Sequence, residues 1–285
     1  MTSEEQKYGA EEPQEWLLFN ADHRHERDEQ IHFYPDPHVY TFQGQELKPV
    51  STLIAEWFPE FDSEAMAEMK ATEACPKEKL LEQWAVRRER AAQAGTFMHR
   101  QIELSLLQQP IGEEFPFVFN GDFHNIDETI SVSRELQMFR HFFEQAHPIP
   151  YRTEWRICDE EYGVAGTIDF LTRAESGEFV MFDWKRSLKI GYEDNYSSST
   201  FHVTLRDDRC GRTAYAPMAH IPDTSVWHYA LQQNLYRYML RKHYGIQVDK
   251  LYLVVLHPEY SDYHLVSLPL LEKEIETMLT CKPVR

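Results

Sequence analysis

No stretch of this sequence approaches the roughly 18 consecutive apolar residues that a membrane-spanning helix needs. Its first residues are acidic, whereas a secretory signal peptide begins with basic and then apolar residues. Cysteine is scarce: the 4 cysteines are scattered, with no C-x-x-C pair, which argues against a zinc knuckle or a secreted disulfide framework. We therefore expect a soluble, intracellular, cytoplasmic protein with no membrane partner.

Basic residues are also in short supply, with 29 Lys and Arg against 47 Asp and Glu and a net charge of -18. Because phosphate binding normally leaves a basic footprint, a nucleic-acid partner would have to be held by local patches and by metal ions. Part of the acidity lies in residues 1–30, which have few apolar residues and no periodicity and are predicted to form a disordered acidic tail. Residues 31–285 are predicted to form a single domain.

The apolar pattern of that domain changes near residue 148. Before it, a short hairpin at 38–50 and a loop at 110–127 accompany segments with helical period, at 51–58, 63–72, 77–107 and 132–146. After it come strand-length segments at 151–158, 164–172, 178–185, 251–256 and 264–268, with helices at 227–243 and 270–279. This order predicts an α/β fold, in which residues 31–147 form a hairpin and helical wall and residues 148–285 a central mixed sheet flanked by helices.

Three charged residues lie on two of the predicted strands. Asp169 ends the stretch G-T-I-D, and Asp183 and Lys185 belong to F-D-W-K on the next strand. Because side chains alternate along a strand, Asp183 and Lys185 should share one face, and a hairpin can bring Asp169 beside Asp183. Two adjacent carboxylates repel unless a cation lies between them, and oxygen ligands suit Mg²⁺ or Mn²⁺.

An isolated D-x-K pattern usually marks an exposed ion pair with no function. The neighbours of this one are apolar, with Ile168 and Phe170 beside Asp169 and Phe182 beside Asp183. Charged groups in such surroundings are costly unless they serve a purpose. The pattern therefore favours a metal-dependent site in which Lys185 either orients a water molecule or stabilises a transition state.

The order G-T-I-D-F, F-D-W-K and a following helix with Gln232 and Tyr236 resembles the PD-(D/E)XK nucleases. Within them it is most similar to the RecB-like branch, which includes lambda exonuclease and the mitochondrial genome maintenance exonuclease. The upstream stretch from Gly95 to His99 also looks like the G-T-x-x-H element of that branch. The resemblance covers roughly residues 36–280 and implies a restriction-endonuclease-like core.

The resemblance implies roles for individual residues. Asp169, Asp183 and Lys185 match the catalytic residues of the family, and His99 matches its imidazole ligand. Glu154 matches a further carboxylate ligand, although the acidic residues 159–161 lie nearby and could take its place. The predicted metal ligands are therefore His99, Glu154, Asp169 and Asp183.

Substrate contacts are implied for the Q-x-x-x-Y element formed by Gln232 and Tyr236, which share a helix face. Arginines on the predicted helix that carries His99 and in the loop after Lys185 are further candidates, represented by Arg100 and Arg206. Solvated arginines on an exposed face are the alternative reading. An iron–sulfur cluster is not expected, because Cys281 is the one cysteine left near the C-terminus.

The implied function is a metal-dependent DNA nuclease. An exonuclease acting on ends in recombination, repair or genome processing is favoured, and an endonuclease or a non-catalytic binding module with the same fold are the alternatives. The sequence lacks the G-x-x-x-x-G-K-[ST] pattern of a nucleotide-driven motor, so a helicase or recombination partner would be a separate polypeptide.

Overall fold

The computed structural model describes residues 3–188, 190 and 211–285. Its main element is an eight-stranded mixed sheet with the order β1-β2-β3-β7-β8-β9-β10, to which β6 is added by pairing with β7. These strands are β1 (Ile31–Tyr34), β2 (Val39–Phe42), β3 (Gln45–Pro49), β6 (Pro150–Asp159), β7 (Val164–Arg173), β8 (Phe179–Lys185), β9 (Val248–Val255) and β10 (His264–Ser267). The predicted α/β fold with a central mixed sheet is confirmed.

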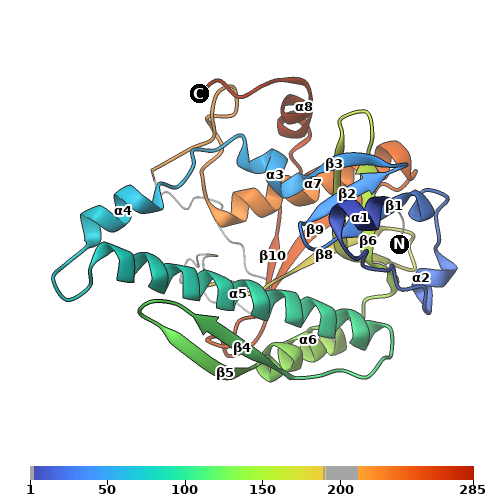
Figure 1. The fold of residues 1–285 in the computed structure, drawn as a ribbon. Coiled ribbons are helices and arrows are strands. Elements are labelled where there is room, and N and C mark those ends of the chain that lie inside the picture. Colours follow the sequence, from blue (N-terminus) through green and yellow to red (C-terminus); the bar gives the residue numbers. More distant parts are fainter. Residues whose placement is uncertain (1–2, 189, 191–210) are drawn as a thin grey trace.

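Helices cover both faces of this sheet (Figure 1). One face packs against α3 (Val50–Ala55), α7 (Ser225–His243) and α8 (Glu272–Thr280), and the other against α5 (Lys77–Leu106) and α6 (Ser133–Ala146). Residues of β8 divide between the two cores, with Met181 towards α7 and with Phe182 and Trp184 towards α5 and α6. Among the described residues, no helix is both long and apolar enough to cross a membrane.

Along one of its edges, strand β7 pairs with two different strands. Its first residues pair in parallel with β3, at Val164 and Ala165, and its last residues pair antiparallel with β8, from Phe170 to Arg173. Residues 166–169 lie between these two partners, and β6 pairs along the other edge. The sheet therefore opens beside the end of the G-T-I-D stretch, and a side chain can enter there without displacing a strand.

The loop predicted at 110–127 is wrong, because a hairpin of β4 (Glu114–Asn120) and β5 (Asn125–Ser131) occupies most of it. Alternate residues of β4 are apolar, and Phe117 is buried in a small core with residues of α5, while Phe115 packs against Phe97. Gly, Pro and Asn residues around the strands obscured this alternation in the sequence. The hairpin lies along α5 in Figure 1.

The first thirty residues also differ from the prediction of a disordered tail. They contain α1 (Ser3–Tyr8), α2 (Phe19–Asp22) and a turn of 3-10 helix at Asp28–Gln30. Asn20 is buried and accepts a hydrogen bond from the backbone N–H of Thr153, and Asp28 forms a buried ion pair with Arg152 at 2.8 Å. Polar side chains make these contacts, and composition alone assigns such residues to solvent. The remaining helix, α4 (Ser63–Lys70), precedes α5.

Candidate metal centre and its pocket

Three side chains from three elements converge at the opening in the sheet. His99 comes from α5, Glu154 from β6 and Asp169 from β7, and one ligand atom of each lies within 4.8 Å of the others. His99 Nδ1 is 3.5 Å from Asp169 Oδ2 and 3.9 Å from Glu154 Oε1. One imidazole nitrogen and two carboxylate oxygens therefore face a common point, which we call the Asp169 cluster.

His99 is held in the orientation that a metal ligand requires. Its Nε2 lies 2.9 Å from the backbone carbonyl oxygen of Trp184, which accepts a hydrogen bond from the ring and leaves the Nδ1 lone pair facing the carboxylates. Such a bond to the second ring nitrogen is the usual way in which proteins fix a ligating histidine. Burial, together with the nearby Lys185 ammonium, lowers the pKa of His99 to about 4, so the ring is neutral at physiological pH.

Glu154 is the most unusual residue of the cluster. Its φ of 46° places it in the left-handed region, which a glutamate adopts at a cost and which is frequent at functional sites. Its Oε1 is buried without a hydrogen-bond partner in the described part of the chain. Burial, and then the proximity of Asp169, raises its pKa well above the usual range. A cation in the cluster would satisfy this oxygen and replace the proton.

Asp169 lies where β7 and β8 separate. Its Oδ2 accepts a hydrogen bond of 2.8 Å from the backbone N–H of Trp184 and so connects the two strands at the opening. Burial raises the pKa of Asp169 to about 6, and burial likewise raises the pKa of Asp183 to about 6. Two carboxyl groups that share this low-dielectric site resist ionisation together unless positive charge is added.

Asp183 and Lys185 form an ion pair in which Lys185 Nζ is 2.6 Å from Asp183 Oδ2. The strand alternation predicted this shared face. Burial acts to lower the pKa of Lys185, but the charges of Asp183 and Asp169 outweigh it and hold that pKa above its usual value. Asp183 is not one of the three residues whose ligand atoms lie within 4.8 Å of one another, although it was predicted as a ligand with them.

The donor set fits a divalent cation. It offers a neutral imidazole and two carboxyl groups, and Oε1 of Glu154 is the carboxyl oxygen without a hydrogen-bond partner among the described residues. Asp183 lies beside the set. Oxygen-rich sites of this kind suit Mg²⁺ or Mn²⁺, and the imidazole favours Mn²⁺ of the two. The cysteines that the structure describes lie outside the cluster.

Helix α7 supports the site from the other face of the sheet. Gln232 Nε2 donates a hydrogen bond of 2.9 Å to the hydroxyl of Tyr236, and Lys185 Nζ lies 4.6 Å from the centroid of the Tyr229 ring. A side chain at Gly166 would come within 2.5 Å of the Tyr236 ring, which explains the glycine of G-T-I-D. Tyr236 is 4% exposed and packs against β7 at Gly166, and the predicted substrate contact of Gln232 and Tyr236 stays a prediction.

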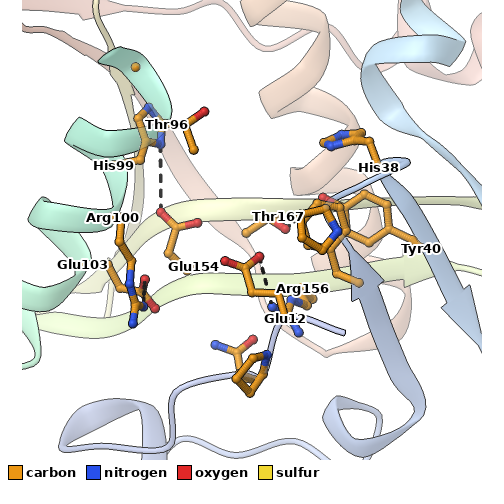
Figure 2. Close-up of a pocket in the computed structure, with 15 residues that line it drawn as sticks. Glu12, His38, Tyr40, Thr96, His99, Arg100, Glu103, Glu154, Arg156 and Thr167 are labelled. Atoms are coloured by element: carbon orange, nitrogen blue, oxygen red, sulfur yellow. Dashed lines mark hydrogen bonds and ion pairs between the residues drawn. The ribbon is translucent and has the colours of Figure 1, made fainter. Parts of the chain in front are cut away.

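A pocket of about 560 Å³ opens beside the cluster (Figure 2). His99 and Glu154 form part of its wall, and β1 and β2 contribute aromatic side chains to the rest of it. The residues around it that the sequence did not single out include Glu12, Phe33, His38, Tyr40 and Arg156. No local motif marks them, because they come from separate segments and meet only in the folded chain.

The two arginines predicted to contact substrate have different outcomes. Arg100 lies in the pocket wall, but its guanidinium group binds Glu103 at 2.6 Å and Glu15 at 3.1 Å. Arg206 lies outside the described residues. Arg156 was not predicted, yet it lies in the same wall and is 7% exposed.

Comparisons with known proteins do not assign this chain to a family. No protein-family model and no curated protein matches the sequence. Among solved structures, the chain is similar to the crystal structure of SSO0001 with 14% sequence identity and a TM-score of 0.29, over 81% of this chain and 72% of that one. A likeness at this level does not assign a family.

Proposed function

We propose that the protein is a nuclease that hydrolyses phosphodiester bonds with Mg²⁺ or Mn²⁺ at the Asp169 cluster. The observation that carries this proposal is the convergence of His99, Glu154 and Asp169 on one point, next to the buried pair of Asp183 and Lys185. The ligands suit a divalent cation, and the lysine supplies a positive charge at its side. A phosphodiester is a substrate whose negatively charged oxygens can interact with both the cation and the lysine.

Each residue has a distinct part in this proposal. His99, Glu154 and Asp169 hold the cation, and Asp183 lies near enough to Asp169 and His99 for their charges to act on its pKa. The bound cation supplies Lewis-acid polarisation of the phosphate and a lowered pKa of water. Lys185 stays protonated, because carboxylates surround it, and it can stabilise the negative charge that develops on the phosphoryl oxygens. Asp183 holds the ammonium group in place.

The fold family belongs to the proposal as well. A carboxylate on β7, an Asp-x-Lys pair on the antiparallel neighbour β8 and a histidine from a long helix support a restriction-endonuclease-like core of the PD-(D/E)XK type. The RecB-like branch is favoured by the G-T-x-x-H and Q-x-x-x-Y elements that contribute His99 and Gln232. By that resemblance the substrate is DNA, attacked from an end in recombination, repair or genome processing.

The test is digestion of end-labelled linear DNA and of circular DNA with Mg²⁺, Mn²⁺ or EDTA. Wild type is compared with Lys185→Ala and Asp183→Asn, and with Lys250→Ala, which changes an exposed lysine on β9. The proposal expects metal-dependent loss of linear DNA in wild type and Lys250→Ala alone. Cutting of circles would assign an endonuclease. Absence of wild-type cleavage with either metal would favour a non-catalytic module with the same fold.

A further inference from the structure

Residues 11–16 follow an extended path from the edge of the sheet to the pocket, and we call them the acidic strap. The backbone N–H of Glu12 donates a hydrogen bond of 2.9 Å to the carbonyl oxygen of Phe33 on β1. At the other end, Asn20 donates a side-chain hydrogen bond of 3.1 Å to the carbonyl oxygen of Glu15. The strap therefore has fixed ends and contains no helix or strand of its own.

The strap directs two carboxylates at the arginines of the pocket wall. Glu12 Oε2 lies 3.6 Å from Arg156 Nη2, and Glu15 Oε1 lies 3.1 Å from Arg100 Nη2. Figure 2 shows Glu12 and Arg156 joined in this way beside Glu154. The neighbouring Glu11 contacts His32 instead, at 3.0 Å. The carboxylates of Glu12 and Glu15 thus contact guanidinium groups of the pocket wall, and Glu11 serves as an internal reference.

Both arginines are close to the metal ligands in the chain. Arg100 follows His99 on α5, and Arg156 lies two residues beyond Glu154 on β6. They are the arginines among the described residues that line this pocket. A nucleic-acid strand with one phosphate at the cluster would bring adjacent phosphates towards them. A guanidinium group binds a carboxylate and a phosphate through the same donors, so strap and substrate need the same partners.

We propose that the acidic strap is an internal competitor of the substrate, an inference that rests on the proposed nuclease function. Glu12 and Glu15 then hold the positions of two backbone phosphates. The strap adds negative charge next to the cluster and must leave, at least through its side chains, before a nucleic-acid strand can bind Arg100 and Arg156. The molecule is thereby kept in a restrained state until a polyanion displaces the carboxylates.

The strap contacts are suited to displacement. The side chains of Glu12 and Glu15 are 48% and 32% exposed and that of Arg100 is 41% exposed, whereas that of Arg156 is 8% exposed and lies 3.6 Å from Glu12, beyond hydrogen-bond distance. Ion pairs at such exposure change equilibria by roughly twofold to fivefold each. The buried contacts of Asn20 and Asp28 hold the chain just beyond the strap, so the strap can leave its arginines while the remaining N-terminal segment stays packed.

The experiment measures binding of a labelled single-stranded or duplex oligonucleotide by fluorescence anisotropy, at saturating Mn²⁺. Every variant carries Asp183→Asn to suppress cleavage. Glu12→Gln combined with Glu15→Gln is expected to tighten binding by about tenfold, because two competing charges are removed. Glu11→Gln combined with Glu4→Gln removes the same charge from the N-terminal region, one position in the strap and one in α1, where the carboxylates contact His32 and Tyr34 and not the pocket arginines. This control is expected to change binding by less than about twofold. Arg156→Gln should weaken binding.

The outcomes separate the strap from the proposed function. Tighter binding in the Glu12/Glu15 variant alone supports the strap, and misfolding cannot imitate a gain of affinity. Equal affinity of the parent and both glutamine variants overturns the strap and leaves the nuclease proposal standing. Equal tightening in both double variants overturns it too, because net charge then explains the gain. If no protein binds DNA, the nuclease proposal falls and the strap falls with it.

Discussion

Two clusters of acidic residues and histidine each include a residue of strand β6, and they differ in what balances their charge. Besides the Asp169 cluster, Asp159, Glu160 and His243 place ligand atoms within 4.8 Å of one another, and we call them the Asp159 cluster. Judged by residue type and spacing, both are candidate metal sites. Their surroundings distinguish them.

The Asp159 cluster is already neutralised by the protein. Lys242 Nζ lies 2.9 Å from Asp159 Oδ2, and the backbone N–H groups of residues 161 and 162 donate to Oδ1. Arg27 binds Glu160 and lowers its pKa to about 2. Burial acts to raise the pKa of Asp159, but hydrogen bonds from Lys242 and His243 outweigh it and lower that pKa. The negative charges of Asp159 and Glu160 are therefore already balanced without a metal ion.

The Asp169 cluster has the opposite character. Its carboxyl groups have raised pKa values, Glu154 Oε1 lacks a hydrogen-bond partner among the described residues, and the nearby ammonium of Lys185 is bound to Asp183. A deficit of positive charge, together with a strained backbone at Glu154, supports the proposal that a cation binds this cluster. Charge balance is therefore more informative than the composition of a cluster.

The largest effect expected from this comparison is on cleavage. Lys185→Ala should lower kcat by about a thousandfold, because one preorganised charge at a transition state is worth about that much. Lys242→Ala removes the lysine of the Asp159 cluster and should leave kcat within about twofold. Single-turnover digestion of labelled DNA measures both. A comparable loss in the two variants would mean that the Asp159 cluster also takes part in the chemistry.

Metal affinity should separate the clusters next. Glu154→Gln should weaken Mn²⁺ binding by at least about tenfold, because a charged ligand becomes a neutral amide. Glu160→Gln should leave the affinity unchanged, since Arg27 occupies that carboxylate. Isothermal titration calorimetry gives both dissociation constants. Loss of Mn²⁺ binding in Glu160→Gln, with Glu154→Gln unaffected, would reverse the assignment of the two clusters.

In the absence of metal, a substitution in the Asp159 cluster should lower the free energy of unfolding more than one in the Asp169 cluster. Asp159→Asn should reduce the free energy of unfolding by about 1–3 kcal/mol, because Asp159 is fully buried and its partner Lys242 loses a charged acceptor. Glu154→Gln should change it by less than about 0.5 kcal/mol, because burial and the proximity of Asp169 raise the pKa of this carboxyl group and so disfavour the charged form that the amide lacks. Urea denaturation in EDTA measures the two values, and a larger loss for Glu154→Gln would contradict the comparison.

The pH dependence of stability should differ in sign between the clusters. The folded pKa of Asp169 is raised to about 6 from 3.8, so the folded state takes up a proton and metal-free stability falls as pH rises from about 4 to 6. Asp169→Asn should remove about 1–3 kcal/mol of this fall. The lowered pKa of Asp159 stabilises the fold above pH 3.8, and this contribution is lost as pH falls further. Thermal unfolding in EDTA at pH 4, 5, 6 and 7 measures this dependence. If Asp169→Asn loses stability with rising pH as steeply as the wild type does, Asp169 is not the source of the fall.

Local pattern was sufficient for the strands and for the pairing of charges within one strand. The predicted strands at 151–158, 164–172 and 178–185 correspond to β6, β7 and β8, and period-two alternation placed Asp183 and Lys185 on one face. It failed for the first thirty residues and for β4 and β5, where buried polar contacts and scattered turn residues masked the order. The first thirty residues are held by polar contacts that apolar periodicity does not report, whereas β4 and β5 do pack through apolar residues, whose alternation the turn residues hid.

The sequence by itself determined the central sheet, its flanking helices and the shared face of Asp183 and Lys185, because each depends on neighbours within one element. Only the tertiary structure decided that Glu154, and not an acidic residue at 159–161, joins His99, since Lys242 and Arg27 neutralise the others from distant segments. It alone brought Arg156 and the acidic strap to the pocket. Charge balance acts through space over a few ångströms, and the order of residues along the chain does not encode which opposite charges will be within that range.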